Sequence, residues 1–187
     1  MIKIIKNFLS KEKANILEQD FMGHHIPWFW NDTTTNVNDK TKYNTKNTID
    51  LGQFVHSIKS EEMTSSIFEG FKKVVNNINY DNLIRIKANL NSNKTGYKKS
   101  SHQPIHNDTH LPGYKSLIYY VNDSDGDTIF FNDNLKEIKR VNPKKGKAVL
   151  FDSNILHCGS NPINTLNRVV INFIFKGNGN EKSILYR

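Results

Sequence analysis

The chain has 187 residues, of which 36% are apolar and 24% are charged, and its 11 Phe and 7 Tyr exclude a disordered chain. This length predicts a single domain, residues 1–187, that folds without a disulfide or metal staple. No apolar run approaches the ~20 residues of a membrane span, and the first residues are too interrupted by charge for a signal peptide. With one cysteine, Cys158, these features predict an intracellular, cytoplasmic protein with no membrane partner.

The formal net charge is +8, from 26 basic and 18 acidic residues. Such a charge is compatible with a nucleic-acid partner or an acidic substrate. However, Asn, Lys and Ile, which have AT-rich codons, make up 68 of the residues. We therefore attribute the lysines to base composition and do not favour nucleic acid as the partner. In such a chain an arginine stands out, because there are four arginines against 22 lysines.

Residues 1–80 are predicted to supply helical support for the rest of the chain. Residues 10–22 begin with a hydroxyl cap and carry apolar residues at helical spacing, which predicts a helix. The aromatic cluster PWFW at 27–30 is predicted to be a core strand. Residues 31–47 contain almost no apolar side chain and are predicted to form a long mobile loop. A second helix is predicted from residue 60 to about residue 76.

From residue 83 the pattern changes to a period of two. In LIRIKANL, apolar side chains share one face of the strand, while Arg85, Lys87 and Asn89 share the other. Further strands are predicted at 104–109, 116–121, 127–131, 137–141, 147–151, 155–158 and 168–175. Two helices followed by about eight short strands predict a mainly β (α+β) fold. It is a jelly roll over residues 83–176 with the helices packed on one sheet.

One His-x-acid motif is present, in which His106 and Asp108 are two residues apart. On a strand, this spacing points both side chains to one face. His157 lies 49 residues after Asp108, near the end of another short strand. Two histidines and one carboxylate form the facial triad of non-haem Fe(II) oxygenases, so these three residues are predicted metal ligands. His102 and His110 remain rival ligands.

Arg168 lies 11 residues after His157 and begins the strand RVVINFIF. A guanidinium on an inward face must be paired, because an unpaired buried charge is costly. Its planar fork suits a carboxylate held by two parallel hydrogen bonds. A salt bridge to an internal acid is the alternative. Together with the histidines and Asp108, the pattern favours a small-molecule carboxylate as the partner of Arg168.

The stretch from His102 to Lys176 resembles the Fe(II)/2-oxoglutarate-dependent oxygenases, specifically their prolyl 4-hydroxylase-like branch. The matching segments stand in the family's order: IHND, SLIYYVND, GDTIFF, PKKGKAVLFDS, HCG and NRVVINFIF. The N-terminal half resembles the family only loosely, through its FLS opening and the PWFW cluster. The family usually has Gly-Gly where this chain has Gly126 and Asp127.

The resemblance implies a double-stranded β-helix, a cupin-like jelly roll with N-terminal helices on its larger sheet. It implies that the His-x-Asp motif and the distal histidine hold Fe(II), and that Arg168, Tyr120 and Asn172 bind 2-oxoglutarate. It also implies O2 as co-substrate, ascorbate as an optional reductant, and hydroxylation of a substrate C–H with release of succinate and CO2. A protein or peptide substrate, hydroxylated on proline, is favoured, and residues 31–47 fall where the family places a lid.

Two alternatives stay open. A cupin-like metal-binding protein that is no oxygenase would share the jelly roll and the histidines, but it would give no reason for Arg168 or Tyr120. The other is a nucleobase or small-molecule oxygenase of the same superfamily, of which the nucleobase enzyme would use the lysine-rich segments 85–99 and 136–147. A nucleobase enzyme needs a pocket with stacking aromatics for a flipped base, and the sequence identifies none.

Overall fold

The computed structural model describes residues 1–177. Its elements follow in the order β1 (Ile2–Ile5), α1 (Lys11–Met22), β2 (Phe29–Asn31), α2 (Val37–Lys42), β3 (Gln53–Lys59), α3 (Phe68–Val75), β4 (Asn82–Ser92), β5 (Tyr114–Tyr120), β6 (Thr128–Phe131), β7 (Glu137–Val141), β8 (Ala148–Asp152), β9 (His157–Gly159) and β10 (Asn167–Lys176). No helix in this part of the chain is long and apolar enough to cross a membrane.

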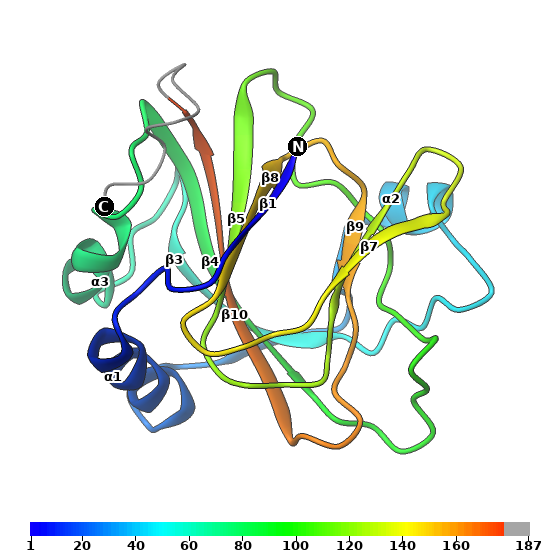
Figure 1. The fold of residues 1–187 in the computed structure, drawn as a ribbon, viewed down its shortest axis with the longest axis horizontal. Coiled ribbons are helices and arrows are strands. Elements are labelled where there is room, and N and C mark those ends of the chain that lie inside the picture. Colours follow the sequence, from blue (N-terminus) through cyan, green and yellow to red (C-terminus); the bar gives the residue numbers. More distant parts are fainter. Residues whose placement is uncertain (178–187) are drawn as a thin grey trace.

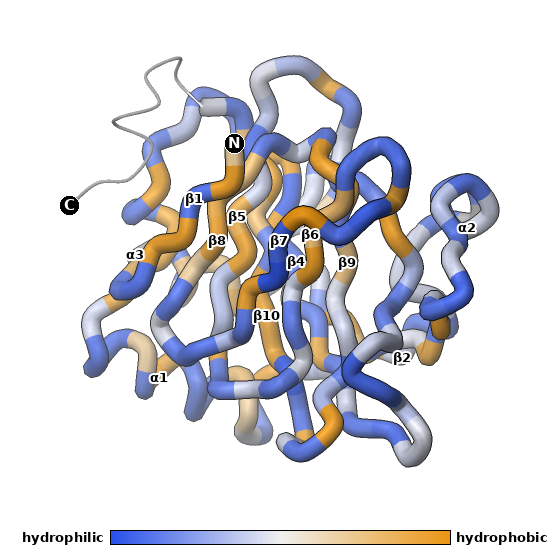
Figure 2. Tube along the Cα trace, turned by 45° about the vertical axis from the view of Figure 1, so that its right-hand side comes forward, coloured by the Kyte–Doolittle hydropathy of each residue, from blue (hydrophilic) through white to orange (hydrophobic). Residues whose placement is uncertain are grey.

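The strands form two antiparallel sheets that face each other (Figure 1). The larger sheet has the order β1-β8-β5-β10-β4-β3-β2, and the smaller has the order β7-β6-β9. Apolar residues from both sheets fill the space between them, among them Ile118, Phe130, Phe151 and Val170. Figure 2 shows hydrophobic residues along β6 and β10, with hydrophilic loops around them. The predicted jelly roll is confirmed.

Helices α1 and α3 cover the outer face of the larger sheet (Figure 1). Phe21 of α1 meets Phe71 of α3 edge-on at 6.0 Å, and Phe71 stacks on Phe173 of β10 at 5.8 Å between ring centroids. Leu117 and Tyr119 of β5 complete this cluster. This core stabilises the larger sheet on its helix-covered face. The opposite face of the same strands, which points toward the smaller sheet, can therefore include polar side chains.

The helix predicted at 10–22 is confirmed as α1. The Ser10 hydroxyl accepts a hydrogen bond from the main-chain N–H of Lys13 at 3.3 Å, which caps the first turn. Ala14, Leu17 and Phe21 form its buried stripe.

The second predicted helix begins later than the sequence pattern indicates. α3 starts at Phe68, because residues 60–67 turn back along the end of β3 instead. Thr64 bridges Lys59, and the N–H of Ser65 donates to the carbonyl of Ile58 at 2.9 Å. These strand-like hydrogen bonds use the backbone groups that a first helical turn would need.

The prediction of a core strand at 27–30 is wrong in its burial. The strand exists as β2, but it is the three-residue edge of the larger sheet and pairs only with β3. Phe29 is 61% exposed and Trp30 is 55% exposed. Only Trp28 packs against the helix core, edge-on to Phe21.

The long mobile loop predicted at 31–47 contains a short helix, α2. Asn36 caps α2 by accepting a hydrogen bond from the N–H of Asp39 at 2.8 Å. The Thr33 hydroxyl donates to the Asp50 carboxylate at 2.7 Å. Local polar caps therefore organise a segment that has too few apolar residues to be predicted from hydrophobic periodicity.

Candidate metal centre and carboxylate pocket

His106, Asp108 and His157 meet at one point between the sheets. One ligand atom from each lies within 4.8 Å of the others. His106 and His157 are brought together by a pair of main-chain hydrogen bonds of 3.0 and 2.8 Å, which form an isolated bridge. The strand predicted at 104–109 is therefore wrong, since only this single bridge forms. It nevertheless aligns the two imidazoles, whose ring centroids lie 4.7 Å apart.

Both imidazoles are oriented by backbone carbonyls. The Nδ1 of His106 lies 3.1 Å from the carbonyl of Pro104, and the Nδ1 of His157 lies 2.9 Å from that of Ile155. When each Nδ1–H donates to its carbonyl, each Nε2 keeps its lone pair for a metal ion. Burial and the neighbouring His157 lower the pKa of His106 to about 4. His106 is therefore neutral at pH 7, which is the protonation state that binds metal.

The Asp108 carboxylate is fixed by three donors from the larger sheet. It accepts hydrogen bonds from Arg85 at 3.0 Å, from the Ser116 hydroxyl at 2.6 Å and from the Asn172 amide at 3.0 Å. Burial opposes its ionisation, but His157 and Arg85 outweigh burial and lower the pKa of Asp108 to about 2. The carboxylate is therefore ionised at neutral pH.

The two rival histidines are engaged elsewhere. His102 has its Nδ1 2.8 Å from the carbonyl of Gln103 and its Nε2 3.0 Å from the Thr45 hydroxyl. His110 is exposed and pairs with Asn107. Among residues 1–177, His106, Asp108 and His157 are the one group of three or more such side chains that could share a metal ion.

Arg168 is buried, with 4% of its surface exposed, and all its partners are uncharged. Its Nε donates to the carbonyl of Gly126 at 2.8 Å, and its Nη2 donates to the Thr128 hydroxyl at 2.9 Å. A weaker contact of 3.5 Å reaches the Asn91 amide oxygen. In the described part of the chain no carboxylate forms an ion pair with Arg168, so the internal salt bridge considered above is absent there. A buried cation without an anion indicates a site for an anionic ligand.

Tyr120 reaches this site through Thr128. The Tyr120 hydroxyl donates to Thr128 Oγ1 at 2.9 Å, the same oxygen that accepts from Arg168. Since that oxygen accepts twice, the Thr128 hydroxyl proton is available to a ligand. Asn172, in contrast, bonds Asp108 rather than Arg168. The structure therefore places Thr128 next to Arg168, and the sequence analysis did not identify Thr128. Tyr120 contacts Thr128 and does not hydrogen-bond Arg168 directly.

A cavity of about 430 Å³ joins the two ends of this site. Its walls include all three candidate metal ligands and Arg168. Five buried polar side-chain atoms without a partner belong to residues that line it: Thr34 Oγ1, Arg85 Nε, Asn89 Oδ1, Asn91 Nδ2 and Asn172 Oδ1. Unpaired buried polar atoms are costly, so their concentration here indicates a polar ligand.

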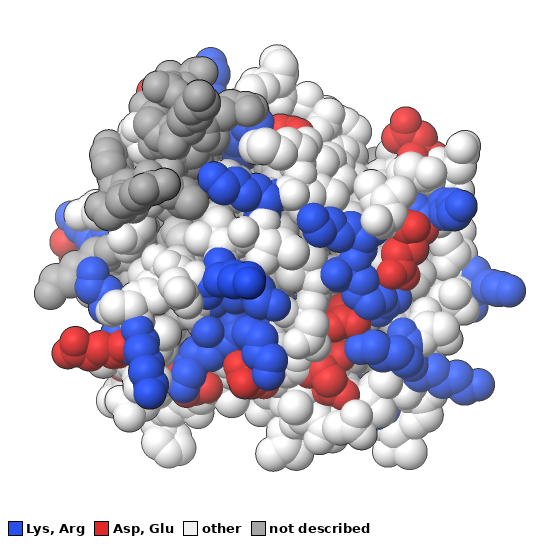
Figure 3. Space-filling view, in the orientation of Figure 1, with Lys and Arg blue, Asp and Glu red and all other residues white. Residues whose placement is uncertain are grey.

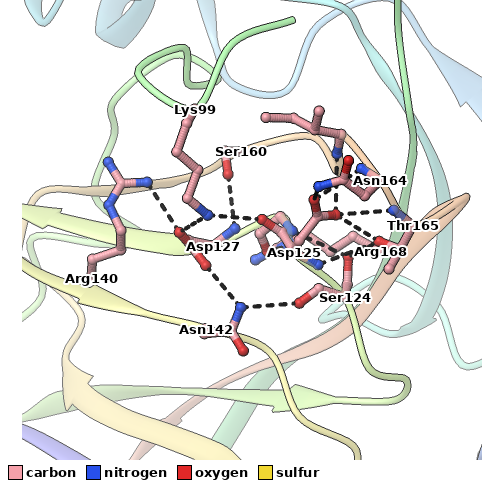
Figure 4. Close-up of polar contacts among 12 residues, drawn as sticks. Lys99, Ser124, Asp125, Asp127, Arg140, Asn142, Ser160, Asn164, Thr165 and Arg168 are labelled. Carbon is pink, nitrogen blue, oxygen red and sulfur yellow. Dashed lines mark hydrogen bonds and ion pairs between the residues drawn. The ribbon is translucent and has the colours of Figure 1, made fainter.

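Asp127, where the family usually has glycine, anchors the wall behind Arg168 (Figure 4). Its buried carboxylate binds Lys99 at 2.7 Å and Arg140 at 3.2 Å, and its N–H donates to the Ser160 hydroxyl at 2.8 Å. Burial opposes ionisation, but the hydrogen bonds from Lys99 and Arg140 outweigh it and lower the pKa of Asp127. Asp127 follows Gly126 directly, so this network fixes the carbonyl that holds Arg168.

Asp125 organises the turn that leads into β10 (Figure 4). It accepts main-chain hydrogen bonds from Ile163, Asn164 and Thr165 at 2.9–3.2 Å. These bonds lower the pKa of Asp125 against the effect of burial. Arg168 is therefore fixed by two networks: Asp127 holds the Gly126 segment that Arg168 bonds, and Asp125 holds the turn before β10.

Comparisons with known proteins agree with this geometry. The sequence model of the 2OG-Fe(II) oxygenase superfamily matches residues 91–176, the part of the chain that holds all the candidate ligands. No curated protein sequence matches the chain.

Solved structures share the fold over nearly the whole chain. A Trichoplax adhaerens prolyl hydroxylase is similar with a TM-score of 0.59 and 14% identity, over 94% of this chain and 83% of that one. A Pseudomonas putida prolyl-4-hydroxylase has a TM-score of 0.53 and 14% identity, over 94% and 92%. A Burkholderia pseudomallei oxidoreductase of the 2OG-Fe(II) oxygenase family has a TM-score of 0.59 and 9% identity, over 94% and 84%.

The chain combines a double-stranded β-helix with a family match over residues 91–176. This match to the 2OG-Fe(II) oxygenase superfamily indicates a 2-oxoglutarate-dependent dioxygenase. Fe(II) is its metal, and 2-oxoglutarate and O2 are its co-substrates. Two imidazoles and one carboxylate suit a ferrous ion, since they leave coordination positions open.

Proposed function

We propose that His106, Asp108 and His157 hold the iron and that Arg168 binds the distal carboxylate of 2-oxoglutarate. The observation that carries this assignment is the pairing of two sites in one cavity. At one end three metal-ligand atoms lie within 4.8 Å of one another, and at the other end a buried guanidinium faces only neutral groups. A ligand with one chelating end and one carboxylate end satisfies both.

The residues of the chain bind and orient the reactants. Iron supplies the activation of O2, while 2-oxoglutarate is oxidised to succinate and CO2 and one oxygen atom enters the substrate C–H as a hydroxyl group. Ser116, Asn172 and Arg85 hold Asp108 in one orientation, which keeps its ligand oxygen in place. The Thr128 hydroxyl, held by Tyr120, completes the carboxylate site beside Arg168.

We further propose that the substrate is a protein or peptide and that the hydroxylated residue is proline. Support comes from the shared fold with two prolyl hydroxylases, one of which was solved with a peptide fragment of the hypoxia inducible factor oxygen degradation domain. The cavity lining also includes Asn31 of β2 and Thr34 of the polar segment after it, so the cavity extends from the candidate metal ligands to the edge of the larger sheet.

The test is succinate formation from 2-oxoglutarate with Fe(II), with and without ascorbate, followed by mass spectrometry for a +16 Da product. Proline-containing peptide panels and lysate proteins serve as substrates. We expect His106→Ala to abolish succinate formation, and His110→Ala, a change at an exposed histidine, to preserve it. Wild-type turnover by His106→Ala would show that the ligand assignment is wrong.

A further inference from the structure

Lys87 stands unpaired in the wall of the cavity. It lies on the inward face of β4, opposite Asn172 of β10, and therefore beside the residue that bonds Asp108. In the part of the chain that the structure describes, no hydrogen bond or ion pair satisfies its ammonium group. Burial, reinforced by the charge of Arg85, lowers the pKa of Lys87 to about 8. The side chain is therefore still mainly cationic at pH 7.

The charges around the cavity do not balance. Asp108 is the one acidic residue among the described residues of its lining, against the cations Arg85, Lys87 and Arg168. The net positive charge of bound Fe(II) with Asp108 cancels the net negative charge of dianionic 2-oxoglutarate with Arg168. Arg85 and Lys87 then leave two positive charges in the cavity lining, where a further anion is favoured.

The part of the cavity lining that comes from β2, β3 and the segment between them offers no acid. It consists of neutral hydrogen-bonding residues, among them Asn31, Thr34, Asn36 and Gln53. A lysine that served only to fill space would be replaced at lower cost by methionine, because desolvating an unpaired ammonium is unfavourable. An unpaired lysine at this position is therefore explained by a ligand.

We propose that Lys87, with Arg85 beside it, binds a carboxylate side chain of the substrate, so that the substrate is an acidic peptide with Asp or Glu close to the hydroxylated residue. This inference rests on the proposed function, since it takes the substrate to be a peptide bound next to the iron. The co-substrate is the other source of a carboxylate, and the two sources are separable by experiment.

The experiment measures binding by calorimetry to protein loaded with Mn(II) and 2-oxoglutarate. The probes are short proline peptides with Glu and Asp within two residues of the proline, and matched peptides with Gln and Asn instead. We expect wild-type protein to bind the acidic set at least tenfold more tightly. Lys87→Met should reduce this preference below threefold, and Lys87→Arg should restore it.

Lys136→Met, a change at an exposed lysine, is the matched control and should keep the full preference. The affinity for Mn(II) and for 2-oxoglutarate is measured on the same samples. Protein that binds both but shows no preference for acidic peptides, or binds neither peptide set, overturns the inference and leaves the iron and co-substrate assignment intact. A Lys87→Met variant that loses 2-oxoglutarate affinity and keeps the peptide preference would assign Lys87 to the co-substrate. Failure to bind Mn(II) and 2-oxoglutarate at all would instead contradict the proposed function.

Discussion

Arg168 is positioned before any ligand arrives. Its Nε is fixed by the Gly126 carbonyl, and one Nη2 hydrogen bond goes to Thr128. The remaining N–H groups have only the long contact to Asn91. A guanidinium whose plane is fixed and whose outer donors are unused loses little conformational freedom when it binds a carboxylate, and this favours tight binding.

Replacement of Arg168 should therefore weaken 2-oxoglutarate specifically. A charge-assisted hydrogen bond contributes about 1.5–3 kcal/mol, so Arg168→Ala should raise the dissociation constant by about tenfold to a hundredfold or more. Arg168→Lys should lose less, because it keeps the charge. Tyr120→Phe should cost least, since Tyr120 acts through Thr128. Calorimetric titration with 2-oxoglutarate in the presence of Mn(II) measures each change.

Affinity for Mn(II) itself should be nearly unchanged in all three variants, and the melting temperature of each reports whether it is folded. Normal 2-oxoglutarate binding by folded Arg168→Ala protein would show that Arg168 has a structural role and does not bind the co-substrate.

At the scale of single elements, the strands were predictable where one face is apolar and the other polar. β4 is the clearest case, because its Arg85, Lys87 and Asn89 face the cavity while its apolar residues face the helices. The start of the helix predicted at 60–76 was wrong, because Thr64 and Ser65 fold back and pair with the end of β3, which competes with helix formation. Local periodicity contains no information about such pairing.

The same limit applies to the site. The spacing of His106 and Asp108 brings out a candidate ligand pair, and the rarity of arginine draws attention to Arg168. Ser116 and Thr128 could not be found this way, because they reach Asp108 and Arg168 through the arrangement of β5, β6 and β10. Asp127 gave a signal as a departure from the family pattern, but its ion pairs come from distant segments.

The turn before β6 provides a second prediction, since it has no room for a side chain at Gly126. A Cβ there would lie 2.5 Å from the Ser160 carbonyl oxygen and 2.9 Å from both Arg168 Cδ and Pro162 N. Gly126→Ala must displace backbone or Arg168, and overpacking of this kind costs about 1–3 kcal/mol. We expect a lower melting temperature and a several-fold weaker affinity for 2-oxoglutarate, measured by thermal unfolding and calorimetry.

Gly70→Ala is the matched control for this turn. Gly70 lies in α3, where a Cβ meets nothing within 4 Å. Alanine is favoured over glycine in a helix by up to about 1 kcal/mol, so this variant should be as stable as wild type or more so. Its 2-oxoglutarate affinity should be unchanged. Equal 2-oxoglutarate affinity for the two alanine variants would show that the Gly126 turn does not position Arg168.

Across the whole molecule, the excess positive charge is spread rather than gathered into a track on the face shown in Figure 3. Acidic side chains lie between the basic ones, and ion pairs such as Lys145 with Glu18 and Lys144 with Asp123 neutralise part of the surface. The net charge of +8 still attracts acidic molecules over the distance set by salt screening. Such attraction would raise the association rate of an acidic peptide, while the unpaired Lys87 would select it inside the cavity.

The candidate metal centre also connects the two sheets, and this leads to a prediction about the stability of the whole fold. His106 and His157 pair with each other next to β6 of the smaller sheet, whereas Asp108 is bonded to residues of β4, β5 and β10 in the larger one. An ion held by all three would bind the folded chain in preference to the unfolded one. At a free metal concentration a hundred times the dissociation constant, the stabilisation is about 2.7 kcal/mol.

For a chain of this size, that free energy corresponds to a rise in melting temperature of about 5–10 °C. Mn(II) is a suitable ion, because the same nitrogen and oxygen ligands bind it without oxidation by air. We expect Mn(II) to raise the melting temperature of wild-type protein and of His110→Ala, and EDTA to reverse the rise. His106→Ala should lose the effect, because two of the three ligands cannot bridge the sheets as tightly. An undiminished rise in His106→Ala would place the ion elsewhere, whereas a rise lost only in His110→Ala would make the exposed histidine the ligand.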